Sequence, residues 1–194
     1  NMSNSFFMPF KFIFLFFIIL TLLICFFFIP TIYSSNNENY TFTLSSFGYV
    51  WPTPGYNSIN SYFGKRYSPT AGASSFHKGI DIGAPENSKI LAVASGTITY
   101  TGFFGGGGYT ITLTSGTTKI TYCHVSPKYI VKEGDNVVKG NIIGYVGPKN
   151  VYGVKGNPYK DSNGNPTNGA TTGPHLHLGV RVNDEYIDPL SLYD

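Results

Sequence analysis

The segment TTGPHLHLGV at residues 171–180 contains two of the chain's four histidines, one residue apart. Its alternating pattern predicts a β-strand, in which side chains at positions i and i+2 lie on the same face. The imidazoles of His175 and His177 should therefore point to one side and the neighbouring leucines to the other. Two imidazoles on one strand face indicate a metal site, a proton-transfer site or both, with an exposed polar face as the alternative.

Residues 51–194 continue this β-strand character. Glycines recur every few residues, and no segment of this part has the periodicity of a long helix. Runs rich in Val, Ile, Thr and Tyr predict strands within 89–102, 109–114, 118–125, 133–147 and 176–182. The sequence VNDEY at 182–186 predicts a hairpin turn. We therefore expect an all-β domain built on antiparallel sheet, a sandwich or barrel in character.

A continuous apolar run, FIFLFFIILTLLICFFFI, occupies residues 12–29. As a helix, this uncharged run would span roughly 27 Å, close to the ~30 Å hydrocarbon core of a bilayer. Lys11 precedes the run, and the positive-inside tendency then places the N-terminus in the cytoplasm. We expect a cytoplasmic stub with a transmembrane anchor at 1–29, an extracytoplasmic linker at 30–50 and a folded domain at 51–194.

Cysteine content and charge narrow the classes of protein further. Cys25 lies in the apolar run and Cys123 in the domain, so they are not expected to pair and no disulfide framework is predicted. Bulky residues around Cys25 disfavour a lipoprotein, and the lack of a small-x-small site disfavours a cleaved signal peptide. The net charge of +3, without a Lys/Arg cluster, argues against a nucleic-acid partner.

Two segments of the domain are irregular. The sequence GFFGGGGY at 102–109 lacks the Gly-Lys-Ser/Thr ending of a phosphate-binding loop, so we expect a structural or groove-forming hairpin loop. Residues 147–173 are long for a connection, which favours a functional or mobile loop. The DSNGNP sequence that begins at Asp161 is similar to a calcium loop. However, Pro166 and Thr172 stand where glycine and glutamate would be needed, so no calcium site is predicted.

The other two histidines lie in FHKGIDIGAP and TYCHVSP. His77 and Asp81 would be ~13 Å apart in an extended strand, so they converge only if the chain bends between them, which Gly79 permits. A catalytic zinc site takes three His, Asp or Glu ligands and leaves one position open, with proton-transfer groups nearby. Four histidines and one aspartate are enough for such a site, although spacing does not decide which of His175 and His177 would be a ligand.

The motifs SYFGKRYSP, FHKGIDIGAP, TYCHVSP and TGPHLHLGV follow one another between Trp51 and Tyr193. In this combination the chain resembles the lysostaphin-type (LytM-like) zinc metallopeptidases of bacterial cell walls. The resemblance implies one zinc ion with three protein ligands, beside two catalytic histidines that are not ligands. The ligands would be His77, Asp81 and His177, and the catalytic histidines would be His124 and His175.

The resemblance also implies a substrate groove on an antiparallel sheet and hydrolysis of peptide cross-links in peptidoglycan through a metal-activated water. Tyr122 stands two residues from His124, on the same face of a strand, and Thr172 precedes the His175 strand. Both are therefore candidates to line the groove, with packing in the domain as the alternative role of Tyr122. Together with the anchor, the resemblance predicts a single-pass protein of the bacterial cell membrane with its N-terminus inside and its peptidase domain outside.

The chain departs from the family pattern at several positions. Cys123 stands where a small residue is usual, and its position next to His124 on a strand predicts that it faces the opposite side as a small core residue. A cysteine nucleophile at this position is the alternative. Tyr109 replaces an asparagine often found before the next strand, and the 147–173 loop is longer than usual. These changes concern the groove walls more than the metal.

Two other classes of function compete with a peptidase. One is a membrane-tethered scaffold or regulator of other wall hydrolases, which would have the same fold without activity. The other is a module that binds wall glycans, which would leave the four histidines unexplained. Because the chain keeps all five residues of the implied site, we expect an enzyme.

Overall fold

The computed structural model describes residues 48–194, so the predicted anchor and nearly all of the predicted linker lie outside the described residues. Within 48–194 no helix is long and apolar enough to cross a membrane. The strands are β1 Ile59–Ser61, β2 Gly64–Lys65, β3 Phe76–His77, β4 Ile80–Ile82, β5 Lys89–Leu91, β6 Gly96–Phe103, β7 Tyr109–Ser115, β8 Thr118–Cys123, β9 Asn136–Val137, β10 Ile142–Tyr145, β11 Leu176–Val182 and β12 Glu185–Ile187. Two short 3-10 segments, η1 Gly105–Gly107 and η2 Pro189–Leu192, are the helical elements of this part.

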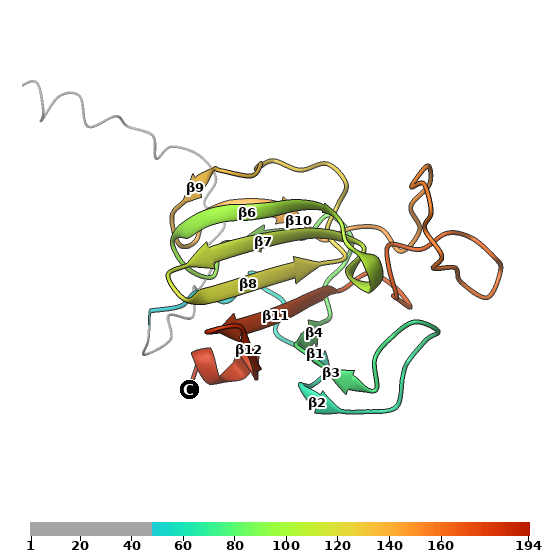
Figure 1. Cartoon of the computed structure of the whole chain (residues 1–194), viewed down its shortest axis with the longest axis horizontal. Coiled ribbons are helices and arrows are strands. Elements are labelled where there is room, and N and C mark those ends of the chain that lie inside the picture. Colours follow the sequence, from blue (N-terminus) through green and yellow to red (C-terminus); the bar gives the residue numbers. More distant parts are fainter. Residues whose placement is uncertain (1–47) are drawn as a thin grey trace, which may run out of the picture. The chain divides into compact units, whose positions relative to one another are not determined.

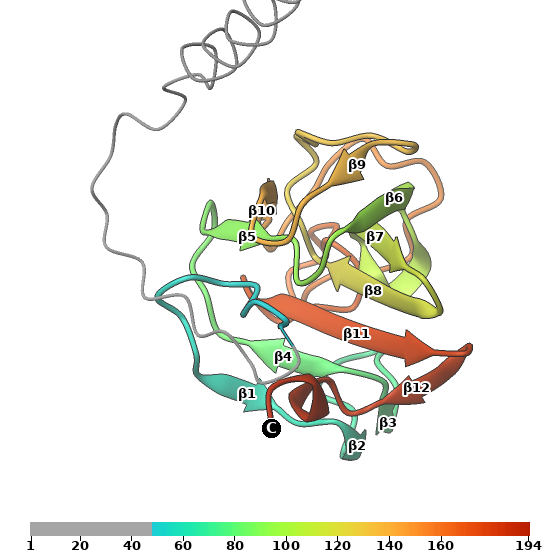
Figure 2. The ribbon, with the colours of Figure 1, turned by 90° about the vertical axis from the view of Figure 1, so that its left-hand side faces the viewer.

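One large antiparallel sheet organises the domain. Its strand order is β1-β4-β11-β8-β7-β6-β9, and β12 pairs with β11 beside this path. Figure 2 shows these strands one after another, from β9 at the top to β1 below. The pairs β5–β10 and β2–β3 form two small sheets, also antiparallel. The predicted all-β antiparallel fold is therefore confirmed.

The two faces of the large sheet have different side chains because successive residues of a strand point to opposite sides. On one face, apolar residues of the central strands are fully buried, among them Ile111, Leu113, Ile120, Leu176, Leu178 and Val180. Ile90 of β5 and Ile143 of β10 belong to the same core cluster, so the small β5–β10 sheet covers this face. The other face stays open and carries polar and small residues.

Short connections join neighbouring strands of the sheet. Asn183 and Asp184 adopt positive φ angles of 51° and 64° in the predicted hairpin turn between β11 and β12. This combination is typical of the tight turns that match strand twist. The glycine-rich 102–109 segment connects β6 to β7 and contains η1, as Figure 1 shows at one end of the sheet. The segment 133–147, in which strands were predicted, forms β9 and β10.

The domain begins slightly before Trp51. Val50, the last residue of the predicted linker, is buried, and its N–H donates to the carbonyl of Val93 at 3.0 Å. The Tyr193 hydroxyl donates to the Val50 carbonyl at 3.0 Å, and the Tyr193 ring packs edge-on against Trp51. The two ends of the described chain therefore lie against one another.

Candidate active site

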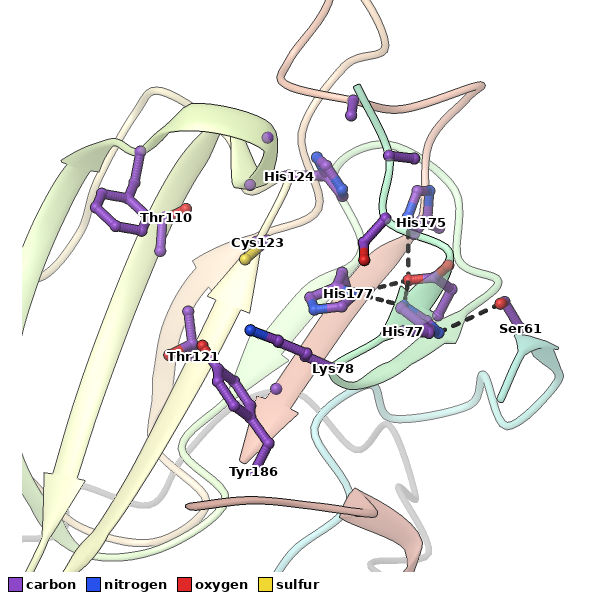
Figure 3. Close-up of a pocket in the computed structure, with 18 of the residues that line it drawn as sticks. Ser61, His77, Lys78, Thr110, Thr121, Cys123, His124, His175, His177 and Tyr186 are labelled. Carbon is purple, nitrogen blue, oxygen red and sulfur yellow. Dashed lines mark hydrogen bonds and ion pairs between the residues drawn. The ribbon is translucent and has the colours of Figure 1, made fainter. Parts of the chain in front are cut away.

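A groove of about 850 Å³ lies on the open face of the sheet. Its floor is formed by β11, β8 and β7, and its walls include residues from 66–74, 104–107 and 170–175. All five residues of the implied site line this groove, as Figure 3 shows for the four histidines. The prediction that His175 and His177 point to the same side is therefore confirmed.

The three predicted ligands converge on one point. Asp81 of β4 and His177 of β11 are directly opposite in the sheet register, and Asp81 Oδ1 lies 2.9 Å from His177 Nδ1. His77 Nε2 lies 3.1 Å from the same carboxylate oxygen and 2.9 Å from His177 Nδ1. Two imidazole nitrogens and one carboxylate oxygen form the donor set that a catalytic zinc site uses.

The convergence depends on the bend predicted between His77 and Asp81. β3 ends at His77 and β4 starts at Ile80, so the two residues are not in one strand. A Cβ atom on Gly79 would lie 2.4 Å from the Leu178 carbonyl oxygen and 2.8 Å from the His177 ring. The close approach of the bend to β11 therefore requires glycine at this position.

Outer partners orient the three candidate ligands. His77 Nδ1 lies 2.9 Å from the Tyr62 carbonyl, which can only accept, so Nδ1 carries the proton and the Nε2 lone pair faces the site. Arg66 donates to Asp81 Oδ2 at 3.0 Å, which leaves Oδ1 turned toward the histidines. The arrangement fits a metal ion. Arg66 was missed as a functional residue, although it lies in the SYFGKRYSP motif.

The electrostatics of the cluster also suit a cation. Burial alone would raise the pKa of Asp81, but hydrogen bonds with His175, His177 and His77 hold it well below the usual range. Burial lowers the pKa of His177. An ionised carboxylate beside a neutral imidazole is the protonation state that metal binding needs.

His124 and His175 lie together on the other side of this cluster, with ring centroids 4.7 Å apart. His124 Nδ1 lies 2.7 Å from the Asn168 carbonyl, and His175 Nδ1 lies 2.9 Å from the Gly173 carbonyl. Each Nδ1–H therefore donates to a backbone oxygen, and each Nε2 remains available for proton transfer. His175 Nε2 is 3.6 Å from Asp81 Oδ1.

His124 is kept neutral by its surroundings. It is 6% exposed, and burial, together with the neighbouring His175 and His177, lowers its pKa to about 3. An imidazole that is neutral at pH 7 can accept a proton from water.

The backbone at His124 corrects two predictions. His124 follows the end of β8 with φ at +59°, a left-handed conformation that interrupts strand alternation. Tyr122 therefore faces the core instead of the groove: it is fully buried, and its hydroxyl accepts the Val93 N–H at 2.9 Å. Cys123 lines the groove together with His124 and is not on the opposite side. Burial raises the pKa of this thiol to about 12, which argues against a cysteine nucleophile.

Residues of both irregular segments, 102–109 and 147–173, hold His124 in place through hydrogen bonds. The side chain of Asn168, in the 147–173 loop, is fully buried. Its Oδ1 accepts the Tyr109 N–H at 2.7 Å, and its Nδ2 donates to the Val125 carbonyl at 3.0 Å. The His124 N–H donates to the Gly107 carbonyl at 2.8 Å. Asn168 was also missed from the sequence, since no periodicity relates it to His124.

The rest of the 147–173 loop is organised internally. Asp161 Oδ1 accepts the N–H groups of Asn163 and Asn165 at 3.0 and 2.9 Å, so this carboxylate caps its own turn. Thr172, the other predicted groove residue, lines the groove at the end of the loop.

The fold and the cluster define a metallopeptidase-type domain, and comparison with known proteins identifies the family. Residues 75–189 match peptidase family M23, and the chain belongs to this family. A DD-carboxypeptidase/endopeptidase, Mpg, of Neisseria meningitidis serogroup B is 33% identical over 138 residues. The match covers 71% of this chain but only 27% of that relative.

Solved structures agree with this assignment. The catalytic domain of lysostaphin from Staphylococcus simulans superposes with a TM-score of 0.56 at 29% identity, over 70% of this chain and 91% of that domain. A zinc-containing peptidase from Vibrio cholerae has the same fold, with a TM-score of 0.56 at 24% identity, over 75% of this chain and 44% of that one. The predicted resemblance to lysostaphin-type peptidases is confirmed.

Proposed function

We propose that this protein is a zinc metalloendopeptidase that hydrolyses peptide cross-links in bacterial peptidoglycan. The observation that carries the proposal is the convergence of His77, Asp81 and His177 within 3.1 Å of one another, beside two histidines whose Nε2 atoms are available. The names of two similar proteins support the same activity, because lysostaphin and Mpg are both named as peptidases.

The residues of the groove divide the work of peptide hydrolysis. His77, Asp81 and His177 would hold zinc, which supplies a Lewis acid that acidifies water and polarises the scissile carbonyl. Burial keeps His124 neutral, so its Nε2 can accept a proton from water. His175, whose Nε2 lies 3.6 Å from Asp81 Oδ1, is close enough to the metal cluster to steady the oxyanion or reach the leaving amine.

The apolar run at 12–29 supports the further proposal of a membrane anchor that holds the domain outside the cell, where the wall lies. Protease added to intact cells should then digest the domain. Recovery of the mature protein from the medium, starting near residue 36, would contradict an uncleaved anchor.

The decisive experiment uses the purified full-length chain in detergent. We expect it to contain zinc and to release soluble peptides from purified peptidoglycan. Mass analysis of these peptides distinguishes cleavage within a cross-link from removal of a terminal residue. Bound zinc without release would favour a non-enzymatic regulator, and absence of zinc would favour a wall-binding module.

A further inference from the structure

The groove continues past the metal cluster along β11 and β8. In the sheet register, His177 is opposite Cys123, Gly179 is opposite Thr121, and Arg181 is opposite Lys119. The Arg181 and Lys119 side chains line the groove on the same face as His177. With a rise of ~3.3 Å per residue, Arg181 lies about 13 Å from His177 along the strand.

Lys78 and Tyr186 complete this end of the groove. The Lys78 ammonium lies 4.8 Å from the centroid of the Tyr186 ring, and the Arg181 guanidinium lies 5.4 Å from it. Figure 3 shows Lys78 and Tyr186 on the side of His177 away from His124. We call Lys78, Arg181 and Tyr186 the cationic subsite. The Tyr186 ring holds both cations near the groove through cation–π contacts.

Positive charge at this end is only partly neutralised. Lys119 pairs with Asp184 at 2.7 Å, and this contact lowers the pKa of Asp184. Within residues 48–194 no carboxylate lies within ion-pair distance of Lys78 or Arg181, although Arg181 is near enough to Asp184 to help lower the pKa of that carboxyl. Arg181 stands directly opposite Lys119 in the sheet, so two cations act on the single carboxylate of Asp184 and a net positive charge remains.

The floor between the metal cluster and the cationic subsite suits a peptide. Gly179 and Thr121 are the opposed pair there, and neither side chain is bulky. An extended peptide lying along β11 would advance ~3.3 Å per residue, so a group within about four residues of the cleaved bond could reach Arg181. A guanidinium binds a carboxylate through two parallel hydrogen bonds.

We propose that the cationic subsite binds a free carboxylate of the peptide substrate, up to about four residues from the scissile bond. The inference rests on the proposed peptidase function and adds a selectivity for acidic peptides on one side of the cleaved bond. Lys78 and Arg181 are specificity residues in this proposal and take no part in the metal cluster.

The test compares two forms of one substrate. Purified peptidoglycan is used either untreated or after its free carboxyls are converted to carboxamides with carbodiimide and ammonia. Initial rates of peptide release are measured at limiting substrate for the full-length protein and for Arg181→Gln, Arg181→Lys and Lys78→Gln. Lys128→Gln, which removes an exposed charge outside the groove, is the matched control.

We expect the unmodified protein to release peptides from untreated walls about 5- to 10-fold faster than from amidated walls. Arg181→Gln should lower the rate on untreated walls by a similar factor and bring the ratio of the two rates close to one. Lys78→Gln should reduce the ratio, Arg181→Lys should keep part of it, and Lys128→Gln should leave it unchanged. Zinc content should stay equal in all variants.

The ratio of the rates on untreated and amidated walls tests the cationic subsite separately from the peptidase function. If Arg181→Gln keeps the ratio of the unmodified protein, or if that protein cleaves both walls at equal rates, the cationic subsite is wrong while the peptidase function stands. If the zinc-loaded protein releases nothing from untreated walls, the peptidase function itself is wrong.

Discussion

The two halves of the candidate site are built in different ways. In the metal half, Asp81 and His177 stand opposite each other in paired strands, so the sheet register itself brings them to 2.9 Å. In the proton-transfer half, His124 follows the end of β8 and His175 precedes β11, and both are oriented by backbone carbonyls of residues 168 and 173. Two ligands of the metal half are aligned by paired strands, whereas both histidines of the other half are oriented by loops.

This difference implies that metal binding and proton transfer can be disturbed separately. The outer contacts of the metal half come from Tyr62 and Arg66, while those of His124 come from Asn168 and the Gly107 carbonyl. No residue in this set supports both halves. Variants on each side should therefore give different signatures in zinc content and activity.

The largest effect is expected from removing a ligand. His77→Ala, Asp81→Ala or His177→Ala should each reduce zinc content from about one ion per chain to near zero and abolish peptide release, because two protein ligands do not complete the site. Zinc is measured by atomic emission on purified protein. Chelation should abolish activity equally, and added zinc should restore only the unmodified protein. If His177→Ala retains zinc and His175→Ala loses it, then His175 is the ligand and His177 is the catalytic histidine.

A smaller loss, with zinc retained, should follow changes in the proton-transfer half. His124→Ala and His175→Ala should keep about one zinc per chain and lose roughly 10²–10⁴-fold in the rate of peptide release. Zinc content and rate are measured on the same preparations. If either variant loses its zinc, that histidine supports the metal and the two halves are not separable.

The same difference explains which features were predictable. Strand alternation correctly predicted that His175 and His177 share a face, and glycine at position 79 correctly indicated a bend that brings His77 to Asp81. Strand alternation predicted the wrong faces beside His124. The left-handed backbone of His124, directly after β8, shifts the alternation by one residue. Tyr122 consequently lies in the core and Cys123 in the groove, the reverse of the prediction.

Contacts made by loop residues could not be predicted from the periodicity of the sequence. Asn168 is 44 residues from the histidine that it orients, and Arg66 is 15 residues from Asp81. Both contacts depend on irregular backbone, which hydrophobic periodicity does not describe. The division of the histidines into ligands and catalytic groups likewise came from the family resemblance, since spacing treats His175 and His177 alike.

An intermediate effect is expected at Arg66, which supports only the metal half. Arg66→Ala removes the donor to Asp81 Oδ2 and should weaken zinc affinity by about 10–100-fold, as loss of an outer partner of a metal ligand typically does. Activity at limiting zinc should fall, and excess zinc should restore most of it. Lys65→Ala, at the exposed neighbouring position, is the control. A rate deficit that zinc does not repair would place Arg66 in the chemistry as well.

The smallest effect, on stability, tests whether the surroundings of His124 keep it neutral without metal. Burial, together with the neighbouring His175 and His177, lowers the pKa of His124 to about 3, against about 6.5 in an unfolded chain. Between these values the unfolded state binds a proton that the folded state excludes. The free energy of unfolding should therefore be fully retained above pH ~6.5 and fall as the pH decreases, by at most ~1.4 kcal/mol per unit from this group.

The measurement is urea unfolding of the metal-free full-length protein between pH 7.5 and 5, followed by the fluorescence of Trp51, the single tryptophan. Metal-free protein is used so that zinc dissociation does not contribute. His124→Asn, which keeps a side-chain N–H for the Asn168 carbonyl but does not titrate, should show a shallower loss of stability by about 2 kcal/mol over this range. His177 is buried in both proteins, so the cost of its burial is common to them. Equal pH dependence in the two proteins would mean that His124 can be protonated in the folded groove.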